Sequence, residues 1–191
     1  MASTYKKKLI NENHYSIANY RIENAPIYKN SHRKKDANQV GFLGEVILEE
    51  FLIENKVNFS DCRNETTHDY LINNNLKLEL KTKDRTVIPK IHYDNSVPIY
   101  NHSHQRPDYY YFISLLRKKD NKTKSINRFT EAFILGGIDI NSLDKYGTYW
   151  KEGDTDTRNG TKFWTDCINV SMKQLISNKN MLEGFKFNIN D

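Results

Sequence analysis

The chain has 191 residues, of which 37% are hydrophobic and 28% charged, and its 12 Tyr and 9 Phe can form the core of one domain rather than a disordered chain. No apolar run approaches the roughly 18 residues of a membrane span, and no apolar segment follows the basic start as in a secretory signal. We therefore expect a cytoplasmic protein with no membrane partner. The formal net charge of +5 is compatible with a polyanionic partner such as nucleic acid.

The N-terminal segment is predicted to lie outside the main domain. Residues 1–30 carry scattered aromatic residues without a clear hydrophobic period, which is typical of an arm or one short helix. The main domain would then span residues 31–191, and the chain shows no internal repeat or low-complexity linker.

A largely buried helix is predicted for about residues 31–55, with Ser31 as its N-cap. Its apolar positions surround most of the helix, which is typical of a helix covered on several sides; they are Val40, Leu43, Val46, Ile47, Leu48, Phe51 and Leu52. Glu45 lies among them, and an embedded carboxylate needs a partner such as a metal ion or a lysine at the sheet. An ordinary surface glutamate is the other interpretation. Gly41 and Gly44 would let this helix approach a sheet closely.

A β-hairpin is predicted for residues 68–81, where two segments of alternating apolar residues flank a turn of three asparagines. A pairing that is symmetric about Asn74 places Asp69 opposite Glu79. Opposed residues have Cβ atoms about 4.5–5.5 Å apart. Two carboxylates this close repel each other unless a cation lies between them or one takes a proton.

The two faces of this hairpin differ in chemistry, because side chains alternate along a strand. The face predicted to pack on the core comprises His68, Tyr70, Ile72, Leu76, Leu78 and Leu80. The polar face comprises Asp69, Leu71, Lys77, Glu79 and Lys81. Carboxylates beside a lysine are suited to a hard cation such as Mg²⁺, although any solvated strand face has a similar composition.

The connection at residues 84–106 is long for a compact domain, which is typical of a functional or mobile loop. Its side chains are suited to stacking on bases or contacting phosphate; they include His92, Tyr93, Tyr100, His102, His104 and Arg106.

Further strands are expected at residues 57–60, 108–116, 129–138 and 167–170. The runs at 108–116 and 129–138 lack alternation, which indicates central strands covered on both faces. A basic hairpin loop would join them, a surface loop would follow at 151–156, and Ser171 would begin a short helix ending at Ile176. Cys62 and Cys167 are expected to be reduced, buried thiols.

The order of these elements resembles the PD-(D/E)XK nuclease superfamily. Asp69 followed by Glu79-Leu80-Lys81 is similar to its central motif, with His68 in place of the proline. Residues 41–46 are similar to the helix that carries a further glutamate, and residues 106–112 resemble the core strand that follows in many members. The resemblance covers roughly residues 36–140 and implies an α/β fold, with a mixed central β-sheet of about five strands flanked by helices, as in a restriction-endonuclease-like core.

The resemblance also implies a catalytic set of Glu45, Asp69, Glu79 and Lys81. Asp69 and Glu79 would hold Mg²⁺ or Mn²⁺, with the Leu80 carbonyl as a further ligand and Glu45 holding a water or a second ion. Lys81 would orient the attacking water and offset the charge that develops on the phosphate.

We therefore expect a DNA-cleaving enzyme, more in the manner of an endonuclease than an exonuclease, and a homodimer stays open. The basic residues around the proposed site, which would contact nucleic acid, are Lys77, Lys83, Arg85 and Arg106. The alternatives are an RNA-directed nuclease of the same fold, a non-catalytic basic nucleic-acid-binding domain, and a structural protein in which these residues form an ion network.

Overall fold

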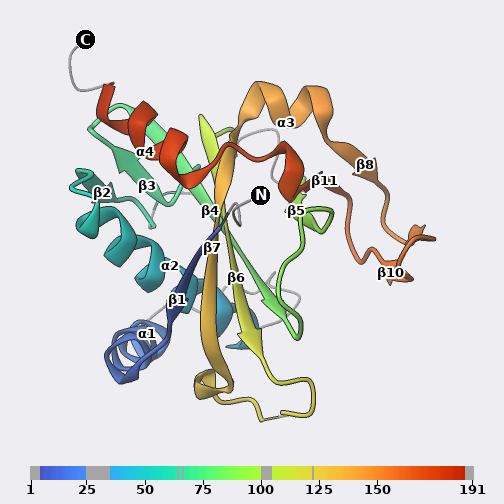
Figure 1. Ribbon diagram of the computed structural model, residues 1–191, viewed down its shortest axis with the longest axis horizontal. Helices are drawn as coiled ribbons and strands as arrows, with labels where there is room; N and C mark the ends of the chain where they lie inside the picture. Colours follow the sequence, from blue (N-terminus) through green and yellow to red (C-terminus); the bar gives the residue numbers. More distant parts are fainter. Residues whose placement is uncertain are drawn as a thin grey trace.

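Two long apolar strands, β6 (Tyr109–Arg117) and β7 (Phe129–Asp139), are neighbours in the interior of a mixed six-stranded sheet (Figure 1). The computed structural model describes residues 5–24, 35–63, 65, 67–99, 105–121 and 123–187. Across the sheet the strands are β1 (Lys6–Leu9), β7, β6, β4 (Leu76–Arg85), β3 (Tyr70–Ile72) and β2 (Phe59–Asp61). β4 and β6 are parallel and the other neighbours antiparallel, so the predicted mixed α/β architecture is confirmed.

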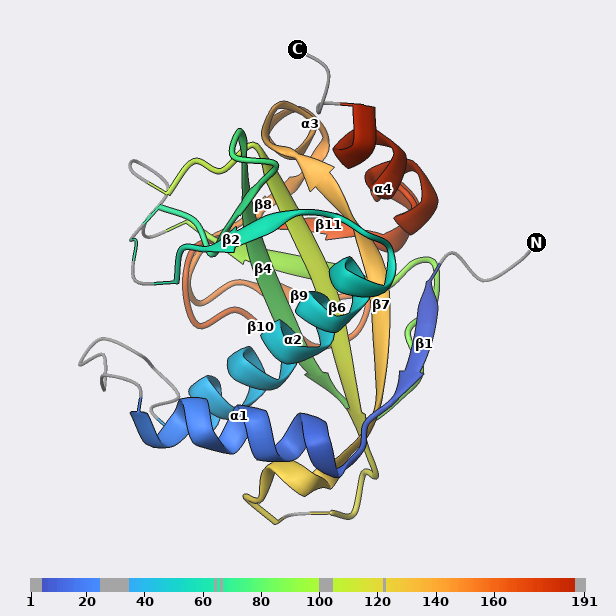
Figure 2. The same ribbon diagram turned by 90° about the vertical axis from the view of Figure 1, so that its left-hand side faces the viewer.

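Helices cover one face of this sheet. α2 (Lys35–Glu54) lies against the sheet, and α1 (Glu12–Asn24) packs on it, as Figure 2 shows. α4 (Asn178–Phe187) adds Met181 and Phe185 to the same core. The seven apolar residues predicted to bury α2 are all buried. A Cβ atom on Gly44 would lie 2.0 Å from Thr82 Oγ1, so this glycine does permit the close approach of helix to sheet.

The opposite face is covered by a three-stranded sheet and a short helix (Figure 1). The strands are β5 (Asp94–Pro98), β11 (Cys167–Ser171) and β8 (Thr148–Trp150), and the helix is α3 (Ile140–Tyr146). Tyr110 and Phe112 of β6 pack into this second core, whereas Tyr111 and Ile113 pack into the first. β6 is therefore buried on both faces, which explains why its sequence lacks alternation.

Several boundaries differ from those the sequence predicted. Residues 6–24, expected to be an arm or a short helix, form β1 and α1, and β1 raises the expected five strands to six. The connection at residues 84–106 contains β5. The surface loop at 151–156 ends in β9 (Thr155–Asp156), which forms a hairpin with β10 (Thr161–Lys162).

The helix expected after Ser171 is one 3₁₀ turn, η2 (Met172–Gln174), and a second such turn, η1 (Ile126–Arg128), precedes β7. Cys62 and Cys167 are both free thiols, with Cys167 buried and Cys62 partly exposed. Ser31, Tyr100, His102 and His104 lie outside the described residues. No described helix is both long and apolar enough to cross a bilayer.

Candidate active site

The β3–β4 hairpin has the predicted register, but its ladder stops at the pair Tyr70 and Leu78, one pair before Asp69 and Glu79. β3 and β4 pair Ile72 with Leu76 and Tyr70 with Leu78. Asn73 and Asn74 have φ values of 49° and 59°, the left-handed conformations that the turn requires.

Asp69 lies just before β3, where the regular ladder has stopped. Its N–H donates to the Leu78 carbonyl at 3.1 Å, and its Oδ2 accepts from the Leu80 N–H at 2.8 Å. The predicted ladder pair between Asp69 and Glu79 is therefore not formed. The Asp69 carboxylate is held by the β4 backbone instead, next to Glu79.

Glu79 is a buried carboxylate, with only 5% of its side chain exposed. Its Oε1 accepts from Lys81 Nζ at 2.6 Å and from Gln105 Nε2 at 3.0 Å. Its Oε2 is also buried, and the described residues offer it no hydrogen-bond donor. The polar face of β4 is thus not a solvated surface at this position. A buried carboxylate oxygen without a donor is costly, and a cation would relieve that cost.

The charge of Glu79 acts on Asp69. Burial and, after it, the neighbouring Glu79 carboxylate raise the pKa of Asp69, whereas the Leu80 N–H, Lys81 and Arg63 lower it, and the net result is a pKa of about 7. Asp69 and Glu79 therefore form the interacting pair of carboxylates that the sequence predicted, although they are not held by the predicted pairing. Lys81 lies beside both of them, with its Nζ 6.0 Å from the centre of the Tyr110 ring.

Glu45 comes from α2 and is 14% exposed. Burial raises its pKa to about 7, and the charge of Asp69 contributes in the same direction. The predicted partner was a metal ion or a lysine at the sheet, whereas the ion pairs that the structure describes are with arginines. Arg63 Nη1 lies 2.9 Å from Glu45 Oε2, and Arg21 Nη1 lies 3.7 Å away. Glu45 therefore approaches the pair of carboxylates, but an ion network already compensates its charge.

That network was not anticipated from the sequence. Arg63 follows β2 and also donates from Nε to Asp61 Oδ1 at 2.7 Å, so one guanidinium binds both Glu45 and Asp61. Arg21 pairs with Glu49 at 2.5 Å. Gln105, which donates to Glu79, was missed as well. These three partners come from other segments, and no local spacing connects them to the hairpin.

The four basic residues predicted to contact nucleic acid lie in different environments. Lys77 is exposed at the start of β4. Lys83 Nζ donates to the Asp94 carbonyl at 3.3 Å, and Arg106 pairs with Asp144 at 2.8 Å. Arg85 is held inside the protein, donating to Ser114 Oγ and to the Asp94 carbonyl, both at 2.9 Å, and burial lowers its pKa. Arg85 thus fastens β4 to β6 and β5.

The residues present fit a hard divalent cation. In the part of the chain that the structure describes, no three His, Cys, Asp or Glu side chains gather as a ready metal cluster. Asp69 and Glu79 nevertheless provide two carboxylates whose repulsion and burial a cation would offset, and Glu79 Oε2 is an unsatisfied oxygen ligand. The Leu80 carbonyl stays a predicted further ligand.

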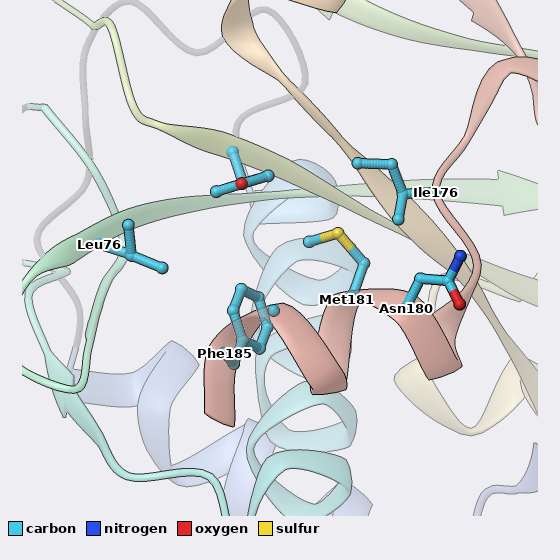
Figure 3. Close-up of a pocket in the computed structure, with 7 residues that line it drawn as sticks. Leu76, Ile176, Asn180, Met181 and Phe185 are labelled. Carbon is cyan, nitrogen blue, oxygen red and sulfur yellow. The ribbon is translucent and has the colours of Figure 1, made fainter. Parts of the chain in front are cut away.

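A separate depression between α4 and the sheet has a different character. It encloses about 50 Å³ and is lined mainly by apolar side chains, including Leu76, Ile176, Met181 and Phe185. Figure 3 shows Met181 and Phe185 pointing from α4 toward the strands. Its polar lining side chains are Tyr109 and Asn180, and the lining contains no carboxylate, basic side chain or thiol.

Comparison of the sequence with protein-family models finds no match, and comparison with curated proteins finds none either. The function is therefore inferred from the chemistry and geometry of the side chains themselves.

Proposed function

We propose that this protein is a metal-dependent nuclease that hydrolyses phosphodiester bonds of DNA, with Asp69, Glu79 and Lys81 as its catalytic residues. The observation that carries the proposal is the buried Glu79 carboxylate, which keeps one oxygen without a donor while Asp69 lies next to it. Two adjacent carboxylates in a buried position are costly, and a cation bound between them would lower that cost.

Each residue has a role that its surroundings support. Asp69 and Glu79 would hold Mg²⁺ or Mn²⁺, and the Leu80 N–H fixes the Asp69 carboxylate in place. The bound ion would supply Lewis acidity toward a phosphate oxygen. Lys81, held by Glu79 at 2.6 Å, would donate to the phosphate and stabilise the negative charge that develops during hydrolysis.

Glu45 has a secondary place in this proposal. Its position near Asp69 suits a residue that holds a water or a second ion, as the family resemblance implies. Its ion pair with Arg63 supports a structural role instead. The two interpretations differ in outcome, because Glu45→Gln would reduce cleavage only if the carboxylate acts in the reaction.

The arrangement of elements supports a restriction-endonuclease-like core. α2 carries Glu45 and lies on the sheet that contains the β3–β4 hairpin. Residues 109–112, the later part of the segment that resembles the family's next core strand, belong to β6, which runs parallel to β4. All elements that resemble the family therefore adjoin one another in space.

The proposal is tested by incubating the protein with supercoiled plasmid, circular single-stranded DNA and RNA, in Mg²⁺, in Mn²⁺ or in EDTA. We expect DNA to be cut only with a divalent ion, and cutting of circular substrates would identify an endonuclease. Asp69→Asn should abolish cutting, whereas Asp120→Asn, an exposed carboxylate in the β6–β7 loop, should not. Preferential cutting of RNA would support the RNA-directed alternative.

Other results of the same experiment would contradict the proposal or favour an alternative function. Cutting that persists in EDTA, or in the Asp69→Asn variant, would contradict the proposed chemistry. Salt-sensitive binding of DNA without any cutting would support the non-catalytic nucleic-acid-binding alternative.

A further inference from the structure

We propose that a groove between β4, β5 and the β9–β10 hairpin binds one unpaired nucleotide of the substrate strand, next to the bond that is cut. The groove encloses about 570 Å³ and is lined by residues of all three elements, among them Lys83, Tyr93, Ser96, Arg158 and Phe163. This proposal rests on the proposed nuclease function and names the form of nucleic acid that the site accepts.

The groove continues the face of β4 that carries the proposed catalytic residues. Glu79, Lys81 and Lys83 alternate along β4 and therefore point to the same side of the sheet. Positions two residues apart on a strand are separated by about 6.5–6.8 Å. Because Lys83 lines the groove, a strand whose phosphate meets Lys81 has its neighbouring nucleotide at the groove's edge.

The charges in the groove favour an anionic chain. Among the described residues that line it, Lys83, Arg85 and Arg158 are permanent cations, while Asp94 and Asp156 are the carboxylates. Arg158 Nη2 lies 2.8 Å from both carboxylates, and the three cations together leave the groove with one net positive charge. Asp156 is buried, whereas the Arg158 side chain is 62% exposed. The groove therefore presents a cation to solvent and keeps its acids inward.

Its walls combine rings with small polar groups, as a base-binding site requires. The Phe163 ring is fixed by stacking on Trp150, with centroids 4.7 Å apart and planes inclined by 18°. Tyr93, which also lines the groove, has its ring centre 5.5 Å from the Arg85 guanidinium. Ser96 and Asn169 can hydrogen-bond the edge of a base. Trp164, which follows Phe163, is 74% exposed, and Lys162 Nζ lies 5.6 Å from the centre of its ring. A second base could stack on this exposed ring.

The volume of the groove limits the ligand to a single nucleotide. Pockets for small ligands enclose about 300–1,000 Å³, so this groove accepts a base with its sugar and phosphate. Stacked base pairs of a duplex do not fit such a space. The nucleotide bound here must be unpaired, either in a single strand or rotated out of a duplex.

The test is the binding of a short labelled single-stranded oligodeoxynucleotide, measured by fluorescence anisotropy in EDTA so that cutting plays no part. Ser96→Trp fills the groove without removing a charge, and it should weaken binding about tenfold or more. Ser60→Trp is the matched control, because Ser60 is exposed on the edge strand β2, and it should leave the Kd unchanged. The same sequence as a blunt duplex should bind more weakly to the wild type.

A second variant keeps the test decisive if Ser96→Trp does not fold, which thermal unfolding would show. Tyr93→Ala removes a stacking ring and should also weaken single-strand binding, by about tenfold. Unchanged single-strand affinity in whichever of these variants is folded would overturn the proposal, as would preferential binding of the duplex. Since binding is measured without a metal ion, these outcomes are independent of whether Asp69→Asn abolishes cutting.

Discussion

At the scale of single residues, the protein retains two carboxylates where burial opposes their charge. Glu79 is buried with one oxygen lacking a donor, and Asp69 is held beside it by the Leu80 N–H. The Glu79 carboxylate raises the free energy of the ionised form of Asp69, and Lys81 compensates only part of this cost. The free energy of unfolding should therefore depend on pH and on divalent cations.

We predict that Asp69→Asn stabilises the protein in EDTA at about pH 8, by roughly 1–3 kcal/mol. The pKa of Asp69 is about 7 in the fold and near 3.8 unfolded, so the folded state binds more protons between these values. Wild-type stability then falls as pH rises through that window, whereas asparagine loses no proton. Denaturant unfolding across the pH range measures the difference, which should vanish below about pH 4.

Glu45 affects the pH dependence in the same direction, since burial raises its pKa to about 7. The charge of Asp69 contributes to that increase, so Asp69→Asn should also reduce the destabilisation that comes from Glu45. Mg²⁺ should stabilise the wild type more than the variant at about pH 8. An Asp69→Asn variant that is less stable than the wild type at every pH would show that the carboxylate is satisfied without a cation.

Lys81→Gln is predicted to reduce the cutting rate by about 10²–10³-fold, because it removes a positive charge aimed at the reacting phosphate. Glutamine retains a donor for Glu79 Oε1, so the variant should stay folded by circular dichroism. Lys179→Gln on α4, whose side chain is largely exposed, is the matched control and should cut normally. Equal rates for all three proteins would remove Lys81 from the site.

At the scale of elements, the position of α2 decides how near Glu45 comes to the hairpin. Gly44 lies where the helix meets Thr82 of β4, whereas a Cβ atom on Gly41 would have no neighbour within 4 Å. The two glycines lie one turn apart on the same helix, but only Gly44 is required by packing.

We therefore predict opposite effects of the two alanine substitutions on the free energy of unfolding. Gly44→Ala should lower it by about 1–3 kcal/mol, because the new methyl group overlaps the Thr82 side chain. Gly41→Ala should raise it by up to about 1 kcal/mol, since alanine favours a helix and meets no obstacle here. Denaturant unfolding compares them directly. Equal effects would mean that α2 does not approach β4 as closely as the structure shows.

At the scale of the whole molecule, the large sheet lies between a helical layer and a smaller sheet, and Glu79 and Lys81 project from β4 on the side opposite the helical core. The face of β4 that bears Glu79 and Lys81 continues into the groove at Lys83 and Arg85. A bound strand would thus follow β4 and draw on charges from several segments of the chain.

The salt dependence of DNA binding should separate cations that contact phosphate from those that hold the fold together. Lys77 is exposed, so Lys77→Ala should make the log–log salt slope shallower by about 0.9 for duplex DNA. Arg85 is held by Ser114 and Asp94, so Arg85→Ala should mainly lower thermal stability. Titrations at several salt concentrations, with Lys173→Ala as an exposed control, measure both effects. If Arg85→Ala decreased the salt slope more than Lys77→Ala did, Arg85 rather than Lys77 would be the residue that contacts phosphate.

The sequence by itself determined the elements whose hydrophobic period is local. The buried helix, the β3–β4 turn and the two long apolar strands follow from spacing within one segment. So does the presence of Glu79 and Lys81 on one face of β4, although Asp69 lies just before β3 rather than in the ladder. β1, β5 and the β9–β10 hairpin were not predicted, because short strands are stabilised by partners distant in sequence.

Only the tertiary structure decided the environment of the charges. Alternation indicated that Glu79 shares a face with Lys77, but the fold buries Glu79 and leaves Lys77 exposed. The partners of Glu45 proved to be Arg63 and Arg21, and Gln105 reaches Glu79 from a distant loop. Burial and ion pairing depend on which segments meet in space, and the period of a single strand contains no information about that.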